Sequence, residues 1–135
     1  MMGKGAMLII VRTVLLFWLL MQPSTSSPFS REATVIVKND LGGGKDLVFH
    51  CMSADNDLGV KDLHSNETFE WRFGVNFLKR TLFHCTFAWT GASHKFEIYN
   101  AKRDYGSCDV CSWIVRENAP CRVFPTHLNC FFWNS

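Results

Sequence analysis

The chain has 135 residues and a formal net charge of +2 at pH 7. A chain of this length forms one domain once any targeting segment is set aside. So small an excess of basic residues argues against a nucleic-acid partner, because the phosphate backbone calls for a strongly basic surface.

The first residues have the pattern of a secretory signal peptide. Lys4 provides a basic start, residues 7–21 are largely apolar, and residues 24–27 are small ones that suit a cleavage site. The uninterrupted apolar run, residues 14–21, is too short for a transmembrane helix, which needs about 20 apolar residues. We therefore predict a signal peptide over residues 1–26.

Residues 27–135 then form a single secreted, extracellular domain, and no membrane insertion of this mature chain is expected. The signal peptide holds two of the 14 basic residues, Lys4 and Arg12, and none of the 12 acidic ones. The mature chain therefore has no formal net charge, which further disfavours nucleic acid as a partner.

Short runs of alternating apolar and polar residues follow, as in strands with one face on a core and one in water. The clearest places Phe69, Trp71 and Phe73 on one face. Residues 60–65 are ambiguous and could form a short helix. The predicted strands are residues 34–38, 47–51, 68–73, 81–89, 95–99, 111–115, 121–124 and 131–133. These strands, separated by turn signals, predict an all-β fold, a small disulfide-stabilised antiparallel β-sandwich.

All the cysteines of the chain lie in the predicted mature domain. They are Cys51, Cys85, Cys108, Cys111, Cys121 and Cys130. An even count in a small secreted domain predicts a disulfide framework. The pairing cannot be read from sequence. Two strand residues three positions apart point to opposite faces, so we favour separate partners for Cys108 and Cys111, namely Cys51 and Cys85. Cys121 would then bond Cys130.

Two other readings of the cysteines are less favoured. The spacing of Cys108 and Cys111 suits a redox pair, but the residues that follow have a strand pattern where a redox site needs a helix. Zinc could draw on Cys51, Cys85 and a histidine, but no second closely spaced ligand pair is present. We predict no metal and no cofactor.

His50 and His84 each precede a cysteine and are predicted to face solvent. Two histidines and a lysine could act as the acid and base of a ribonuclease, since histidine titrates near neutrality. No lysine stands at a fixed spacing from either histidine. We therefore predict that the protein is not an enzyme and keep a small secreted hydrolase or ribonuclease as an alternative.

One N-glycosylation sequon is present, Asn66-Glu67-Thr68. It lies beside a predicted turn and outside any apolar run, as a modified asparagine of a secreted protein should. We predict that Asn66 carries a glycan.

Four blocks of residues, in order and with fitting spacing, resemble the plant self-incompatibility protein family, or S-protein homologues. The blocks are His50-Cys51-x-Ser53 leading to Asp57-Leu58-Gly59; Phe69-x-Trp71-x-Phe73-x-x-Asn76-Phe77; Thr81-Leu82-Phe83-x-Cys85-x-Phe87-x-Trp89; and Arg103-Asp104 leading to Cys108-x-x-Cys111-x-Trp113-x-Val115. The resemblance covers residues 35–121. It implies a secreted, disulfide-bonded β-sandwich with no known catalytic residues, of the kind that includes stigma-side ligands for a pollen membrane receptor in self-pollen rejection.

The chain departs from the family at two places. Asn118-Ala119-Pro120 stands where the family often has a glycine turn, and Cys121 and Cys130 add to the four cysteines that we associate with it. Both departures concern the C-terminal hairpin and leave the expected fold unchanged.

We therefore expect a non-enzymatic extracellular signalling or recognition protein whose loops contact a membrane receptor on a neighbouring cell. Loops on a rigid scaffold are where binding residues concentrate. The candidate contact residues are Asp55, Asn56, Asp57, Lys79, Arg80, Arg103 and Asp104. A defence protein that binds microbial surfaces is a further alternative, and an exposed aromatic patch would favour it.

Overall fold

A computed structural model describes residues 29–76 and 78–135. The predicted signal peptide lies outside these residues. The described chain forms nine strands and one short helix: β1 (Phe29–Asn39), β2 (Leu47–Met52), β3 (Asp57–Leu63), β4 (Thr68–Asn76), β5 (Leu82–Trp89), β6 (Ala92–Asn100), α2 (Ala101–Asp104), β7 (Val110–Val115), β8 (Pro120–Val123) and β9 (Leu128–Cys130). No helix among the described residues is long and apolar enough to span a bilayer.

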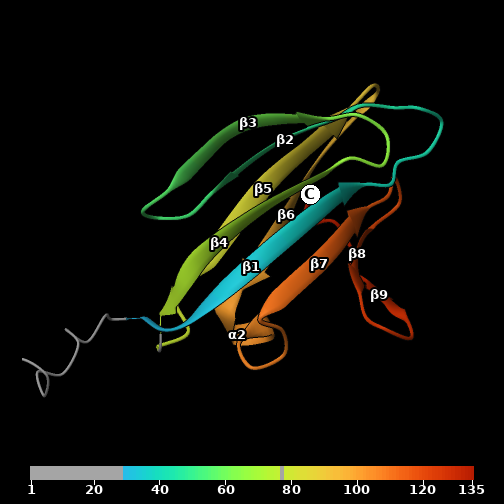
Figure 1. The fold of residues 1–135 in the computed structure, drawn as a ribbon. Coiled ribbons are helices and arrows are strands. Elements are labelled where there is room, and N and C mark those ends of the chain that lie inside the picture. The colour runs from blue at the N-terminus through green and yellow to red at the C-terminus, as the bar shows by residue number, and fades with distance from the viewer. Residues whose placement is uncertain (1–28, 77) are drawn as a thin grey trace, which may run out of the picture.

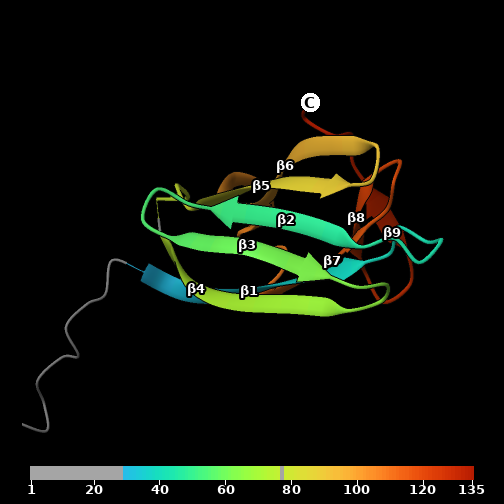
Figure 2. The same cartoon turned by 90° about the horizontal axis from the view of Figure 1, so that it is seen from above.

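The strands form two facing sheets, which confirms the predicted all-β sandwich (Figures 1 and 2). Sheet A has the order β4-β1-β7-β8-β9, and sheet B has the order β3-β2-β5-β6. The pairing is antiparallel except between β1 and β7, which run parallel with Val35 beside Cys111. The predicted antiparallel pairing is therefore confirmed for every pair of neighbouring strands except β1 and β7.

The core lies between the sheets and consists of the residues that alternation placed inward. Trp71, Phe83, Phe87 and Trp113 are buried, and Phe69 and Phe73 are half-buried against them. Aromatic rings contact one another across the layers, for example Phe73 and Phe83 with ring centroids 4.7 Å apart. Burial of such rings is the main source of stability in a domain of this size.

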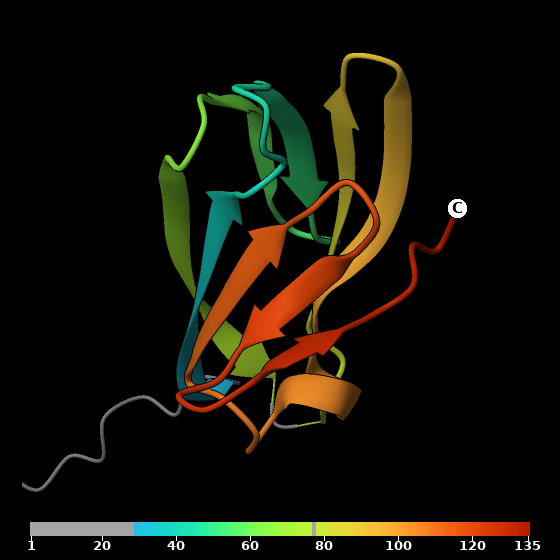
Figure 3. The same ribbon diagram turned by 90° about the vertical axis from the view of Figure 1, so that its right-hand side faces the viewer.

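Three predictions of local structure were wrong. Residues 60–65 are not helical: β3 runs to Leu63 and pairs with β2, Leu63 opposite Leu47. The last strand is Leu128–Cys130, so the predicted strand 131–133 lies outside it. The C-terminal segment is irregular and runs beside β6, where Asn134 and Ser135 hydrogen-bond the backbone of Lys95 (Figure 3). The helix α2 was missed because its four residues are too few to show a helical period.

The favoured disulfide pairing was wrong in two of its three bonds. Cys51 bonds Cys85, with Cα atoms 4.1 Å apart, because the two are directly opposite on β2 and β5. Cys108 bonds Cys111; Cys108 precedes β7, so the alternation that would separate the two side chains does not apply. Cys121 bonds Cys130 across β8 and β9, as predicted. None of the six cysteines is free in this structure.

The carboxylate of Asp104 joins the two sheets from inside the protein. Asp104 is fully buried and accepts hydrogen bonds from the Asn100 backbone N–H at 2.9 Å and from Arg103 Nη2 at 2.7 Å. Its other oxygen accepts from Arg122 Nη1 at 3.0 Å. Because Asn100 ends a strand of sheet B and Arg122 lies in β8 of sheet A, one side chain connects both layers.

Replacing Asp104 should therefore destabilise the fold strongly. We expect Asp104→Ala to lower the free energy of unfolding by about 3–5 kcal/mol, since Arg122 loses its buried counter-ion. The exposed Asp109, 3.5 Å from Arg31, is the matched control, and Asp109→Ala should cost less than about 1 kcal/mol. Denaturant unfolding of the oxidised proteins measures both, and equal losses would contradict the assignment.

Candidate recognition surface

Two loops at one end of the sandwich surround a hollow of about 900 Å³, which we call the end groove. They are the turn between β2 and β3 and the connection between β4 and β5, which lie at the same end in Figure 1. Three of the predicted contact residues, Asp55, Asn56 and Arg80, line the end groove. The structure thus brings together residues that are more than twenty positions apart in the chain.

The walls of the end groove are apolar because it opens between the edges of the two sheets. β3 and β4 are edge strands, one from each sheet, and they run side by side in Figure 2. Leu58 from β3, Phe73 from β4 and Phe83 from β5 line the hollow with Trp71. Trp71 and Phe83 are buried there, and Leu58 and Phe73 are half-buried.

Two charged side chains at the end groove have no partner among the described residues. Neither Arg80 nor Asp55 forms a side-chain hydrogen bond or an ion pair in that part of the chain, and both are exposed. Arg72 also lines the end groove, but its guanidinium lies 4.0 Å from Glu32. Unpaired charges are free to be satisfied by a binding partner.

Asp57 shapes the acidic turn and does not line the end groove. Its carboxylate hydrogen-bonds His50 Nε2 at 2.5 Å and accepts from the Gly59 backbone N–H at 2.8 Å. These bonds favour the charged form and lower the pKa of Asp57, the bond to His50 contributing most. Gly59 has a φ of 74°, a conformation that favours glycine, so the turn needs both residues.

The other predicted contact residues are placed differently. The Lys79 ammonium lies 5.7 Å from the centre of the Tyr105 ring, away from the end-groove lining. Asp104 is fully buried, so its prediction as a receptor contact was wrong. Arg103 is only partly exposed and lies over the ring of Trp113 at 5.1 Å while it hydrogen-bonds Asp104. Arg103 therefore packs on the core and belongs to α2 rather than to a loop, and its role as a receptor contact stays a prediction.

The outer face of sheet B brings the two histidines close to a lysine. His50 is opposite Thr86 of β5, and Thr86 is opposite Lys95 of β6, so the three form a row across the sheet. His84 lies two residues before Thr86 on the same face. His50, His84 and Lys95 line one shallow hollow of about 450 Å³. The sequence showed no such lysine because β6 supplies it.

Asn66, the predicted glycosylation site, is exposed in the turn between β3 and β4. This turn is at the opposite end of β3 from the end groove. A glycan on Asn66 would leave the end groove uncovered.

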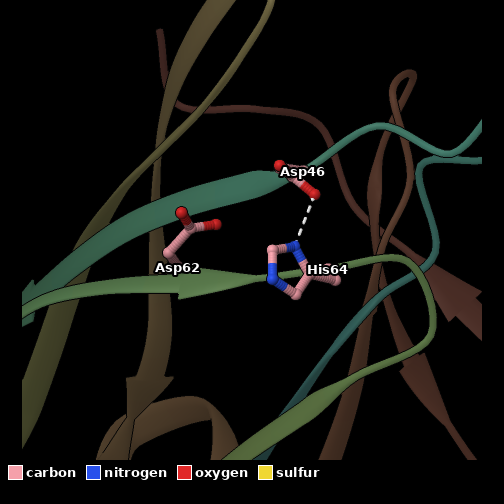
Figure 4. Close-up of side chains that lie close together, drawn as sticks. All are labelled: Asp46, Asp62 and His64. Atoms are coloured by element: carbon pink, nitrogen blue, oxygen red, sulfur yellow. Dashed lines mark hydrogen bonds and ion pairs between the residues drawn. The ribbon is translucent and has the colours of Figure 1, made fainter.

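One group of side chains among the described residues is spaced to hold a metal ion, with ligand atoms within 4.8 Å of one another: Asp46, Asp62 and His64. His64 Nδ1 donates to Asp46 Oδ1 at 2.8 Å across the neighbouring strands (Figure 4). All three side chains are exposed, and their geometry is that of a surface ion pair at the end of the β2–β3 ladder. The hydrogen bond to Asp46 raises the pKa of His64, with nearby Glu67 adding to the effect.

Fold and surface together define a small, disulfide-bonded β-sandwich that displays loops around an end groove. The family model described as plant self-incompatibility protein S1 matches residues 34–133. S-protein homolog 2 of Arabidopsis thaliana is 40% identical over 120 residues, covering 82% of this chain and 74% of the relative. S-protein homolog 5 of the same plant is 40% identical over 106 residues, covering 78% and 81%. The chain belongs to the plant self-incompatibility protein S1 family.

A solved structure supports the fold. It belongs to the self-incompatibility protein homologues, described as a widespread family of small, highly stable, secreted proteins from plants. Its TM-score is 0.59 at 22% identity, and the match covers 78% of this chain and 96% of that one. The resemblance seen in the sequence is thus confirmed for both family and fold.

The pKa of His64 provides a test of the β2–β3 ion pair. Because the folded pKa lies above 6.5, the bond to Asp46 stabilises the fold fully below pH 6.5 and is lost as pH rises through the folded value. We expect an NMR titration to place the His64 pKa above 6.5 and Asp46→Asn to return it toward that value. A wild-type value at or below 6.5 would contradict the pair.

Proposed function

We propose that this protein is a secreted, non-enzymatic recognition protein that acts as the ligand of a membrane receptor on a neighbouring cell. Secretion is supported by the three disulfides and by a structural relative that is described as secreted. Self-pollen rejection is the role that the family name suggests, and other cell-to-cell signalling fits the same features.

The observation that carries this proposal is the convergence of Asp55, Asn56 and Arg80 on the end groove. The groove combines apolar walls with an acidic and a basic side chain that have no partner in the described part of the chain, as binding sites on proteins do. The disulfide between Cys51 and Cys85 joins the two strands next to both loops. Loops held in this way lose little entropy when they bind.

Cell binding by charge-matched variants tests the proposal. Asp55→Ala with Arg80→Ala removes one acid and one base from the end groove. Lys45→Ala with Glu117→Ala removes an ion pair from the opposite end. With labelled protein on plant cells that bind the wild type saturably, the first pair should weaken binding at least about tenfold and the second pair should not. The reverse result would reject the end groove as the contact surface.

A second candidate function, cleavage of RNA, rests on the hollow that His50, His84 and Lys95 line. One histidine would take the proton of the ribose 2′-hydroxyl as it attacks the phosphate, and the other would protonate the departing 5′-oxygen. Lys95 would stabilise the charge that develops on the phosphate oxygens.

Incubation of the pure protein with RNA tests this second function. If the second function holds, the wild type cleaves RNA, and cleavage should fall at least about a hundredfold in His84→Ala and persist in His127→Ala, which removes an exposed histidine of the β8–β9 turn. No cleavage by the wild type, or equal cleavage by both variants, would reject it.

A further inference from the structure

The end groove is open to solvent and is large enough to hold a small molecule. Its volume of about 900 Å³ lies within the range of about 300–1,000 Å³ that small-molecule sites occupy. Leu58, Phe73 and Leu82 are half-buried in its lining, and Phe83 is buried. These side chains belong to three different strands, so the backbone hydrogen bonds of two sheets hold the walls in place.

One hydrogen-bond donor of the lining, the guanidinium of Arg80, has no acceptor among the described residues. Trp71 Nε1 also lacks a partner there, but that atom is buried in the core, as Trp113 Nε1 is, so a molecule in the groove does not reach it. An exposed guanidinium can exchange its water for a charge-assisted hydrogen bond. Arg80 therefore calls for an oxygen atom on the bound molecule.

The lining holds one more arginine than carboxylate, so its formal charge slightly favours an anion. The arginines are Arg80 and Arg72, the second of which lies 4.0 Å from Glu32 outside the lining, and the carboxylate is that of Asp55; His84 also lines the end groove. Arginine binds a carboxylate through two parallel hydrogen bonds. The rings of Phe73 and Phe83 lie 4.7 Å apart in the apolar part of the hollow, where an apolar or aromatic body would pack.

We propose that the end groove binds a small apolar monocarboxylate, with the apolar body against Phe73 and Leu58 and the carboxylate on Arg80. Such a ligand would make the protein a carrier or a two-component signal, which goes beyond recognition by the loops alone. The proposal does not depend on a receptor, because the purified protein alone should bind the acid.

NMR titration of the oxidised, isotope-labelled protein with phenylpropionate tests the proposal. We expect saturable shifts of backbone amides in residues 53–58, 71–74 and 80–84. Phenylpropanol, which lacks the carboxylate, and acetate, which lacks the ring, should each bind at least about tenfold more weakly. Arg80→Gln should weaken phenylpropionate binding about tenfold, whereas Lys79→Gln, beside it but outside the lining, should leave it unchanged.

Several results would overturn the proposal. They are the absence of saturable shifts, shifts confined to other residues, equal binding of the alcohol, or equal losses in Arg80→Gln and Lys79→Gln. Both substitutions are at exposed positions, so a spectrum that matches the wild type away from residue 80 shows that the variants are folded. If the wild-type protein binds the acid but shows no saturable binding to any plant cell, the receptor proposal is rejected and this one stands.

Discussion

The buried carboxylate of Asp104 is the contact on which the rest of the structure depends. A lone buried charge is costly, and this one is stabilised by two guanidinium groups and a backbone N–H. Arg103, which it holds, covers the rings of Phe96 and Trp113 at 5.3 and 5.1 Å. A single ionised group therefore fixes α2, the end of β6 and the start of the C-terminal hairpin in one arrangement.

This arrangement fastens the two sheets together on one side of the sandwich. The Asp104 contacts join α2 and the end of β6 in sheet B to β8 in sheet A. On the other side no strand among residues 29–76 and 78–135 joins β3 to β4, which are the edges of their sheets, and residues of both strands line the end groove. The Cys51–Cys85 disulfide supports β2 and β5 next to the groove. The fold thus combines a fastened side with an open one.

The sequence predicted what depends on local alternation and missed what depends on strand order. Trp71, Phe83 and Trp113 were correctly placed inward because the period of two residues is visible in the chain. The Cys51–Cys85 bond was missed because it requires β2 to be next to β5. Arg103 and Asp104 looked like solvated loop charges, since their partner Arg122 lies 18 residues beyond Asp104.

The sequence predicted several residues of the candidate site but did not predict the shape of the site. Asn and Asp in a turn after a strand indicated the acidic loop. That this loop and Arg80 line the same hollow depends on the two edge strands, β3 and β4, lying next to each other, and the sequence does not show this.

Hydrogen exchange of the secreted protein, free and bound to membranes of cells that bind it, tests the central claim that this end is the recognition surface. We predict that binding protects the backbone amides of residues 53–58 and 78–84 from exchange. Protection confined to the opposite end, in residues 40–46 and 64–67, would contradict it.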